Sequence, residues 1–249
     1  MTISEYGKAL VTGASTGIGA KLVERLTAEG VEVHAIARDA ERLEQLAERT
    51  GAIPHALDLG DTAQLEELIP SLEIDILANI AGVSRMGNIL DSSRDDLDAL
   101  VDINLTAVLH LVRLALPGMV ERNSGHIVNI SSIAAHYNFF GHTAYHATKA
   151  AIHQLSRQIR NDTLGKRIRV TEVSPGRVET EIFGRNLGGT PEAIAAAHKE
   201  YFEGYESLTT QDVTDAIMFA LRMPRHVNVG LLELMPTFQV PGGLTFDRQ

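Results

Sequence analysis

The sequence predicts an α/β fold: a single Rossmann-type domain with a doubly wound parallel sheet of about seven strands and helices on both faces. Three observations predict it. Short apolar runs alternate with longer segments of helical periodicity along the chain. The runs are apolar nearly throughout, as strands buried on both faces of a parallel sheet are. No linker, internal repeat or low-complexity segment interrupts the series, so we expect one domain over residues 1–249.

The strand candidates follow one another at intervals that leave room for helices. The expected strands are 8–12, 31–37, 53–57, 74–80, 126–131, 168–173 and 231–235. After the first, apolar residues recur at helical spacing at Ile18, Leu22 and Leu26, and a charged helix is expected from Asp39 to Arg49.

The segment after the sixth strand breaks this alternation. From Pro175 to Thr210 it is rich in glycine and charge, with a helical piece near 191–205. In an open α/β sheet, a long excursion after the carboxyl end of a strand lies where ligands bind. We interpret residues 177–210 as a substrate lid, and a surface insertion without function is the alternative.

Composition narrows the function classes. The formal net charge of −10 disfavours binding to nucleic acid or to an anionic membrane. The absence of cysteine excludes disulfides, thiolate metal sites and cysteine nucleophiles. The N-terminal sequence shows no signal peptide pattern, and no apolar run approaches the length of about 18 residues that spans a membrane. We therefore expect a soluble, cytoplasmic protein.

A glycine-rich turn follows the first expected strand directly, with the sequence GASTGIG at 13–19. Glycines let the backbone approach a pyrophosphate, and the next helix offers free N–H groups and its positive dipole end. The strand–turn–helix context favours dinucleotide binding, although the spacing is GxxxGxG and a purely structural turn is the alternative. The expected cofactor contacts here are Gly13, Ser15, Thr16, Gly17, Ile18 and Gly19.

The end of the second expected strand bears on the choice between NADP(H) and NAD(H). A carboxylate there would bind the ribose 2′-OH of NAD(H), but this chain has Ala37 followed by Arg38. A guanidinium suits a 2′-phosphate, so NADP(H) is favoured. Asp39 keeps NAD(H) open, and a solvated Arg38 is the alternative. By position, the adenosine side would also be lined by Asp58, Leu59, Asn79, Ala81 and Gly82.

One tyrosine has a lysine four residues further on, in AYHATK at 144–149. On a helix, Tyr145 and Lys149 would lie on one face, where the ammonium favours the phenolate and lowers the phenol pKa. Such a tyrosine can exchange a proton with a substrate oxygen. Ser131 and Ser132 close the fifth strand, where a hydroxyl could stabilise a developing oxyanion; capping of the strand end is the alternative.

Several ordered motifs resemble those of the short-chain dehydrogenase/reductase family over essentially the full chain. They are TGASTGIG (12–19), Asp58, NIAG (79–82), Asn104, IVNISS (127–132), YHATK (145–149) and PGRVET (175–180). The resemblance implies that Tyr145 is the general acid/base, Ser132 the orienting hydroxyl and Lys149 the ligand of the nicotinamide ribose. It also implies that Asn104 holds a water that relays protons through Lys149.

The same resemblance implies cofactor contacts in the PGRVET segment and a quaternary structure. Val178 and Thr180 would contact the nicotinamide carboxamide, with Pro175 and Gly176 beside them. The chain departs from the family at Ile80, where a second asparagine is usual, which would remove a local hydrogen bond. A homotetramer through the helices that carry Asn104 and Tyr145 is expected. An apolar tail at 236–249 could pack on a neighbouring subunit.

The segments 116–131, 179–183 and 224–239 resemble the branch of NADP-dependent serine and 3-hydroxy acid dehydrogenases. The implied substrate is small and polar, and a loop arginine would suit its anionic group through bidentate bonds. The candidates are Arg85, Arg177 and Arg185, with His142 as a further contact. Solvated loop arginines are the alternative. Tyr137, Asn138 and Phe140 are expected to line the same pocket.

The expected function is hydride transfer between nicotinamide C4 and a small polar hydroxy compound or its carbonyl form. The alternatives are reduction of another carbonyl class (ketoacyl, sugar alcohol or amino alcohol), non-catalytic sensing of NADP, and epimerase or dehydratase chemistry with tightly held NAD. His142 and His146 have metal-ligand spacing, but no acidic third ligand is apparent and hydride transfer needs no metal. We therefore expect no metal site.

Overall fold

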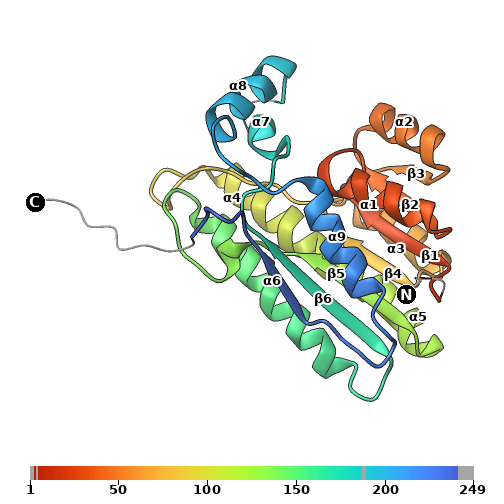
Figure 1. Ribbon diagram of the computed structural model, residues 1–249. Coiled ribbons are helices and arrows are strands. Elements are labelled where there is room, and N and C mark those ends of the chain that lie inside the picture. The colour runs from red at the N-terminus through yellow and green to blue at the C-terminus, as the bar shows by residue number, and fades with distance from the viewer. Residues whose placement is uncertain (1–2, 4, 187–188, 241–249) are drawn as a thin grey trace, which may run out of the picture.

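The computed structural model describes residues 3, 5–186 and 189–240, and it confirms the predicted fold class. Seven parallel strands form one sheet in the order β3-β2-β1-β4-β5-β6-β7 (Figure 1). The strands are β1 (Lys8–Thr12), β2 (Glu32–Ala37), β3 (Ile53–Ala56), β4 (Ile76–Asn79), β5 (Gly125–Ile130), β6 (Ile168–Pro175) and β7 (Leu231–Leu234). Their bounds differ from the expected ones by a few residues at most; β6 runs on to Pro175, which pairs with Leu234.

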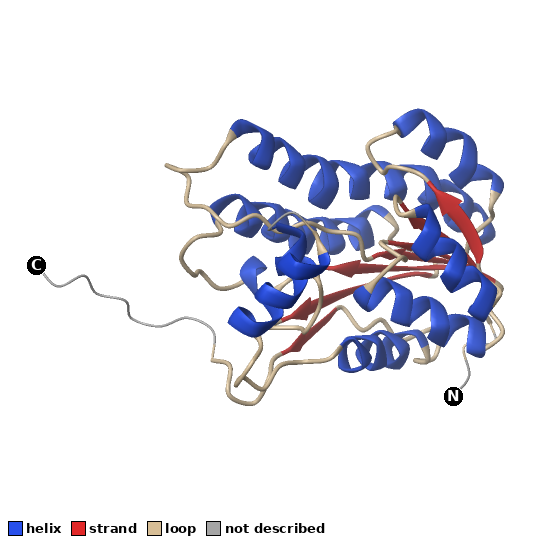
Figure 2. Ribbon diagram, turned by 90° about the horizontal axis from the view of Figure 1, so that it is seen from above, coloured by secondary structure: helices blue, strands red, loops and turns tan. Residues whose placement is uncertain are grey.

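Helices cover both faces of the sheet (Figure 2). One face packs against α1 (Gly17–Ala28), α2 (Ala40–Thr50) and α9 (Thr210–Leu221). The other packs against α3 (Thr62–Ser71), α5 (Ala107–Arg122) and α6 (Thr143–Asp162), and α4 (Arg94–Val101) contacts α6. Successive side chains of a strand point to opposite faces. In β1, Val11 therefore joins one apolar core and Leu10 the other, which explains the unbroken apolar runs.

The strand order reverses between β1 and β4, which is where open α/β sheets bind ligands. The loops after these two strands are held together by the Thr12 hydroxyl, which accepts hydrogen bonds from the backbone N–H groups of Ile80 (3.0 Å) and Ala81 (3.1 Å). The sequence thus builds a rigid crevice at the predicted end of the sheet.

A continuous helical run at 94–122 comprises α4, a π-helical turn (Asp102–Thr106) and α5. By length and composition alone this run could cross a membrane. Leu111 and Met119 are fully buried against the sheet and α3, however, which is the packing of a core helix in a globular domain. A π-helical turn inside an α-helix occurs frequently at functional sites.

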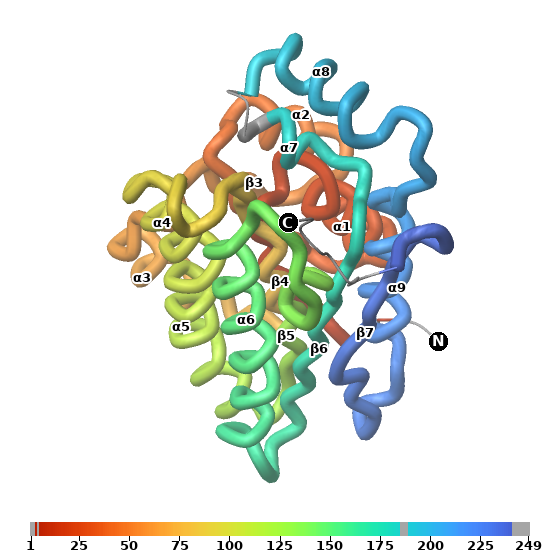
Figure 3. The backbone as a smooth tube through the Cα atoms, turned by 90° about the vertical axis from the view of Figure 1, so that its left-hand side faces the viewer, coloured from red at the N-terminus to blue at the C-terminus, as the bar shows by residue number. Residues whose placement is uncertain are grey.

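The excursion after β6 carries two short helices, α7 (Ile182–Asn186) and α8 (Pro191–Tyr201), which stand beyond the carboxyl end of the sheet (Figures 1 and 3). Its two ends are joined: Leu208 N donates to Arg177 O (2.9 Å), and Glu179 N donates to Leu208 O (2.8 Å). The expected helix at 191–205 ends earlier, at Tyr201. Backbone hydrogen bonds therefore hold the two ends of the excursion next to each other.

Candidate active site

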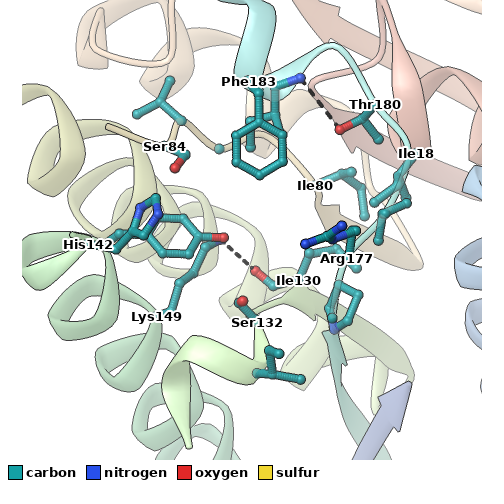
Figure 4. A pocket seen from close by; sticks show the side chains of 18 of the residues that line it. Ile18, Ile80, Ser84, Ile130, Ser132, His142, Lys149, Arg177, Thr180 and Phe183 are labelled. Atoms are coloured by element: carbon teal, nitrogen blue, oxygen red, sulfur yellow. Dashed lines mark hydrogen bonds between the residues drawn. The ribbon is translucent and has the colours of Figure 1, made fainter. Parts of the chain in front are cut away.

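A cavity of 380 Å³ opens at the carboxyl ends of the central strands, and Figure 4 shows Ser132, Lys149, His142, Arg177 and Phe183 around it. It brings together three of the four predicted catalytic residues, Ser132, Tyr145 and Lys149. The cofactor candidates Ile18, Gly82, Pro175, Gly176, Val178 and Thr180 also line it. Residues far apart in the sequence therefore converge on one space.

Tyr145 lies in the first turn of α6, where its phenol is hydrogen-bonded to the Ser132 hydroxyl. Burial raises the pKa of Tyr145, and the bond to Ser132 lowers it by a smaller amount. The expectation that Lys149 lowers the tyrosine pKa is not met. The lysine Nζ lies 5.7 Å from the centroid of the tyrosine ring, and burial weakens its own charge.

Lys149 is buried below Tyr145, one turn further along α6. Its Nζ donates to the carbonyl oxygen of Ile130, 3.0 Å away, at the end of β5. Burial lowers the pKa of Lys149 to about 8 because a low-dielectric site disfavours the ammonium. Among the described residues, no carboxylate lies within 4 Å of this amine. A partner with anionic or acceptor oxygens would restore its positive charge.

The two serines at the end of β5 have different partners. Ser132 accepts from Ala134 N (3.1 Å), where it caps a short 3-10 turn (Ile133–Ala135), and it also meets Tyr145 in the cavity. Ser131 is buried away from the cavity and donates to the Glu172 carboxylate. Ser132 thus caps the 3-10 turn and also lies where the proposed orienting hydroxyl is needed, beside Tyr145. Ser131 does neither.

Asn104 lies in the π-helical turn and is buried. Its Oδ1 accepts from Val83 N (2.8 Å), and its Nδ2 donates to Val83 O (2.9 Å) and to Thr148 Oγ1 (3.3 Å). A Cβ at Gly82 would stand 3.3 Å from Oδ1 and 3.5 Å from the Lys149 Nζ. Asn104 therefore fixes the loop after β4 against α6, directly beside the lysine.

A second cleft of 170 Å³ adjoins the cavity, and Gly82 belongs to both. Its lining includes the predicted residues Gly13, Ser15, Arg38, Asp58, Leu59, Ala81 and Gly82. Gly13 has φ +66°, and a Cβ there would stand 2.8 Å from Ala81 Cα; at Gly19 it would stand 2.3 Å from Gly13 O. Only glycine fits these two positions, because the turn folds tightly on itself at Gly19 and packs against the loop after β4 at Gly13.

Four predicted cofactor residues, Thr16, Gly17, Gly19 and Asn79, line neither hollow. Asn79 is buried in the sheet and donates to Asn129 Oδ1 (2.8 Å), so its side chain does not line the adenosine side. Thr16 is the N-cap residue of α1, and Gly17 lines a separate hollow beside Thr180. The side chain of Asn79 lies on the face of the sheet that α6 covers, because Asn129, its neighbour on β5, donates in turn to Ser156 of α6.

Arg38 and Asp39, at the end of β2, bear on the choice between NADP(H) and NAD(H). Arg38 is exposed, and its Nη1 lies 3.8 Å from Asp58 Oδ2 across the cleft. Asp39 instead caps α2 by accepting from Arg42 N (3.1 Å), and its carboxylate also lies 3.4 Å from the Arg42 guanidinium. The arginine is therefore available to a ligand phosphate, while the aspartate is engaged in the helix.

The predicted substrate arginines differ in their surroundings. Arg177 lines the cavity, donates to Tyr201 O (3.1 Å) and stacks 4.5 Å from the centroid of the Tyr205 ring. Arg85 is outside the cavity lining and forms an ion pair with Asp96 at 3.1 Å, so the structure does not bring it to the site. The side chain of Arg185 lies outside the described part of the structure, as do residues 241–249 of the tail.

The substrate end also contains residues that the sequence prediction missed. Phe139 lines the cavity, whereas Phe140 is 81% exposed and Tyr137 donates to Glu233 Oε1 (3.3 Å), so the expected pocket residues Tyr137 and Phe140 were wrong. Asn138 is also absent from the lining; Ser84, Phe183 and Gln239 belong to it. Within a loop, sequence gives no period from which to infer which neighbour points inward.

His142 lines the cavity, and its Nδ1 is buried without a hydrogen-bond partner among the described residues. Burial lowers the pKa of His142, and the neighbouring His146 lowers it further. The sequence prediction assigned no role to His146. Its Nε2 accepts from Phe139 N (3.2 Å) and its Nδ1 lies 2.6 Å from His142 O, so this ring holds the loop that carries both cavity residues.

A glycine-lined cleft at the switch point of a Rossmann sheet, next to Ser132, Tyr145 and the buried Lys149, is the arrangement of an oxidoreductase site. The family model for short chain dehydrogenases matches residues 7–187. The chain belongs to the short-chain dehydrogenase family.

The similar proteins cover nearly the whole chain. The NADP-dependent 3-hydroxy acid dehydrogenase YdfG of Escherichia coli is 37% identical, covering 96% of this chain and 99% of its own. Serine 3-dehydrogenase of Agrobacterium fabrum is 36% identical, covering 98% and 99%. A solved structure, the closed form of serine dehydrogenase complexed with NADP+, superposes with a TM-score of 0.92 at 36% identity, covering 97% of this chain and all of that one (100%).

Proposed function

We propose that this protein is an NADP(H)-dependent dehydrogenase that oxidises a small polar hydroxy compound, or reduces its carbonyl form. The observation that carries the proposal is the convergence of Ser132, Tyr145 and Lys149 on a cavity continuous with the glycine-lined cleft. The relatives named above are an NADP-dependent 3-hydroxy acid dehydrogenase and serine dehydrogenases, which supports both the cofactor and the substrate class. When bound, the cofactor supplies or accepts the hydride.

The residues of this chain would handle the proton and the oxygen of the substrate. In the oxidation direction, Tyr145 Oη takes the hydroxyl proton of the substrate as the carbonyl forms, and Ser132 Oγ hydrogen-bonds the same oxygen. Lys149 binds ribose hydroxyls, which returns it to the charged form and offsets the raised pKa of Tyr145. Asn104 keeps the loop at Gly82 and Val83 in place, and the water relay implied by the family resemblance remains part of this proposal.

Arg38 would bind the 2′-phosphate that distinguishes NADP(H) from NAD(H). It is exposed at the mouth of the cleft, whereas the carboxylate of Asp39 is held at the start of α2. A phosphate beside Arg38 forms charge-assisted hydrogen bonds, and a free ribose hydroxyl forms weaker ones.

Arg177 and His142 are the proposed contacts for the substrate. No carboxylate lies within 4 Å of the Arg177 guanidinium among the described residues, and this side chain lines the cavity. Arg177 could therefore bind a substrate carboxylate, while the unpartnered Nδ1 of His142 meets a second polar group. A second candidate function is reduction of a larger, less polar carbonyl compound, which the apolar lining by Phe139, Phe183 and Ile133 favours.

A substrate panel tests the proposal. Purified protein with NADP+ is assayed at 340 nm against serine, short 3-hydroxy acids, sugar alcohols and amino alcohols, and the carbonyl forms are assayed with NADPH. We expect turnover with 3-hydroxy acids or serine and a preference for NADP+ over NAD+. Turnover restricted to apolar ketones would favour the second candidate. Cofactor binding without turnover on the whole panel would indicate a sensor.

We further propose that the excursion with α7 and α8 is a lid over the cavity. Phe183 of α7 lines the cavity and stacks on Tyr201 of α8 with ring centroids 4.8 Å apart. Gly184 lies so close to Ile194 that a Cβ would stand 2.5 Å from its Cα, so the two helices pack as one unit. Protection of residues 182–201 from hydrogen exchange on addition of NADP+ would support closure.

We propose a homotetramer of these single-domain chains, assembled through the faces of α5 and α6. An 18-residue window of the helical run 94–122 has a mean hydropathy of 1.7, yet only 39% of that window is buried within the chain. Val101 and Leu109 are exposed on it. Apolar surface of this kind is typical of subunit interfaces. Light scattering after size exclusion checks the assembly, and a monomer would contradict it.

A further inference from the structure

Three side chains from separate elements meet behind the catalytic serine, in a cluster of His136, His153 and Glu172. His136 follows the 3-10 turn after β5, His153 lies on α6, and Glu172 lies on β6. His153 Nδ1 is 2.7 Å from Glu172 Oε2, and His136 Nε2 is 3.5 Å from Glu172 Oε1. One nitrogen or oxygen from each residue lies within 4.8 Å of the others.

The burial of this cluster requires a compensating positive charge. Only 2% of the Glu172 side chain is exposed, and the carboxylate also accepts from the Ser131 hydroxyl. The Nε2 of His136 is buried and has no hydrogen-bond partner among the described residues. One carboxylate and two neutral imidazoles carry a net charge of −1, which is costly to bury unless a proton or a metal ion balances it.

We propose that His136, His153 and Glu172 form a binding site for a divalent transition-metal ion of the zinc class. Two imidazole nitrogens and one carboxylate oxygen suit zinc, whereas calcium and magnesium prefer oxygen ligands alone. At zinc bond lengths of about 2.0–2.2 Å, tetrahedral ligand atoms lie about 3.4 Å apart. His136 Nε2 lies 3.5 Å from Glu172 Oε1, His153 Nδ1 lies 2.7 Å from Glu172 Oε2, and one donor atom of each residue lies within 4.8 Å of the others. Side-chain shifts of about 1 Å would bring the three donors to the zinc separation.

The fourth ligand would be a water molecule or Ser131 Oγ, which donates to the Glu172 carboxylate. The imidazole side chains retain exposures of 17% and 23%, so an ion can enter without unfolding the chain. The site is separate from the proposed hydride-transfer centre, because Ser131 points to Glu172 while its neighbour Ser132 meets Tyr145.

The role of the ion would be to join the elements that support the catalytic cavity. The loop after β5 carries Ser132, α6 carries Tyr145 and Lys149, and β6 leads into the cavity wall at Pro175. A metal bound at their junction stabilises the folded chain in proportion to its binding free energy. The ion takes no part in the hydride step.

A second histidine–carboxylate group in the chain provides a matched control. His34 Nδ1 lies 2.9 Å from His55 Nε2, and His34 Nε2 lies 3.3 Å from Glu32 Oε1. The facing nitrogens of these two rings are hydrogen-bonded to each other, so they cannot both bind one ion without separating. His55→Gln therefore removes a clustered imidazole without touching the proposed site.

The experiment titrates ZnCl₂ into chelator-treated full-length protein by calorimetry and follows thermal unfolding in parallel. We expect one equivalent to bind, and the folded state to be favoured about 100-fold at free zinc of 100 times Kd. His153→Gln and, separately, His136→Gln should lose this binding, while His55→Gln should keep it. Glu172 itself is not substituted, because loss of this buried carboxylate could prevent folding. His136 lies on a loop, so His136→Gln tests the proposal without that risk.

Two results would overturn the proposal. One is wild-type protein that takes up no zinc and unfolds at the same temperature with and without it, which would mean that a proton on a histidine balances Glu172. The other is zinc binding that is equal in the wild type, His136→Gln and His153→Gln. Activity with NADP+ is measured separately, so failure of the proposed dehydrogenase function would not be confused with failure of this site.

Discussion

The proposed cofactor cleft and the proposed substrate cavity meet at Gly82, yet they are built in different ways. The cleft comes from the short loops that follow β1 to β4, and backbone shape at Gly13 and Gly19 decides what fits. The cavity draws side chains from residue 18 to residue 239, including the excursion after β6. Regular strand–loop–helix geometry thus defines one half of the site, and contacts between remote loops define the other.

The largest effect is expected at Tyr145, the residue proposed to transfer the proton in the cavity. Tyr145→Phe removes the phenol oxygen but keeps the ring, so the cleft remains intact. We expect turnover to fall by about 10²–10⁴-fold, the usual contribution of a general acid/base, with NADPH binding unchanged in a fluorescence titration. Tyr137→Phe is the control, since that hydroxyl contacts Glu233 outside the cavity. Full turnover in Tyr145→Phe would rule out the proton-transfer role.

The next effect concerns the free-energy cost of burying the positive charge of Lys149. The pKa of Lys149 is about 8 in the folded chain and about 10.4 in an unfolded one. Between these values the unfolded chain holds a proton that the folded chain has released, so the free energy of unfolding rises with pH through this window. Below pH 8 both states are charged, and the burial penalty of about 3 kcal/mol is present in full.

Lys149→Met removes this titration. We expect the wild type to gain about 3 kcal/mol of stability relative to the variant between pH 7 and pH 10.5, measured by urea unfolding without cofactor. The hydrogen bond to Ile130 O is missing from the variant at every pH and contributes mainly a constant offset. A stability difference that does not change with pH would show that the amine is not charged and buried as described.

A third substitution acts on the cleft alone. Arg38→Leu removes the guanidinium expected to bind the 2′-phosphate. Hydrogen bonds to charged groups contribute about 1.5–3 kcal/mol, so the Kd for NADP+ should rise by about 10–150-fold, while that for NAD+ stays the same. Arg49→Leu, which removes an ion pair with Glu24 away from the cleft, is the control. Equal losses for both cofactors would contradict the selectivity role.

How far the sequence could predict each half follows from this difference. The strands and the glycine-rich turn after β1 were predictable because apolar runs and glycine spacing are local signals. Asn79 was misplaced because its side chain meets Asn129 under α6, and Arg85 because its partner Asp96 lies in another segment. The His136, His153 and Glu172 cluster has no sequence signature, since each residue comes from a different element.

The smallest expected effect tests whether the substrate loop can be changed without disturbing the cleft. His146 joins Phe139 N and His142 O, so it positions two cavity residues without lining the cavity itself. Each of these bonds contributes about 1 kcal/mol, and His146→Ala should raise the substrate KM by about 5–30-fold with little change in kcat or in the Kd for NADP+.

His146→Gln should restore part of this loss, because an amide also offers one acceptor and donors to the same two backbone groups. His226→Ala, at an exposed histidine between α9 and β7, is the control for loss of an imidazole elsewhere. Steady-state kinetics with substrate and cofactor varied separately measure the effect. The cleft and the cavity share Gly82 but not this loop. If the substrate KM and the Kd for NADP+ rose together in His146→Ala, the loop would also affect the cleft, and the cleft and the cavity would not be independent.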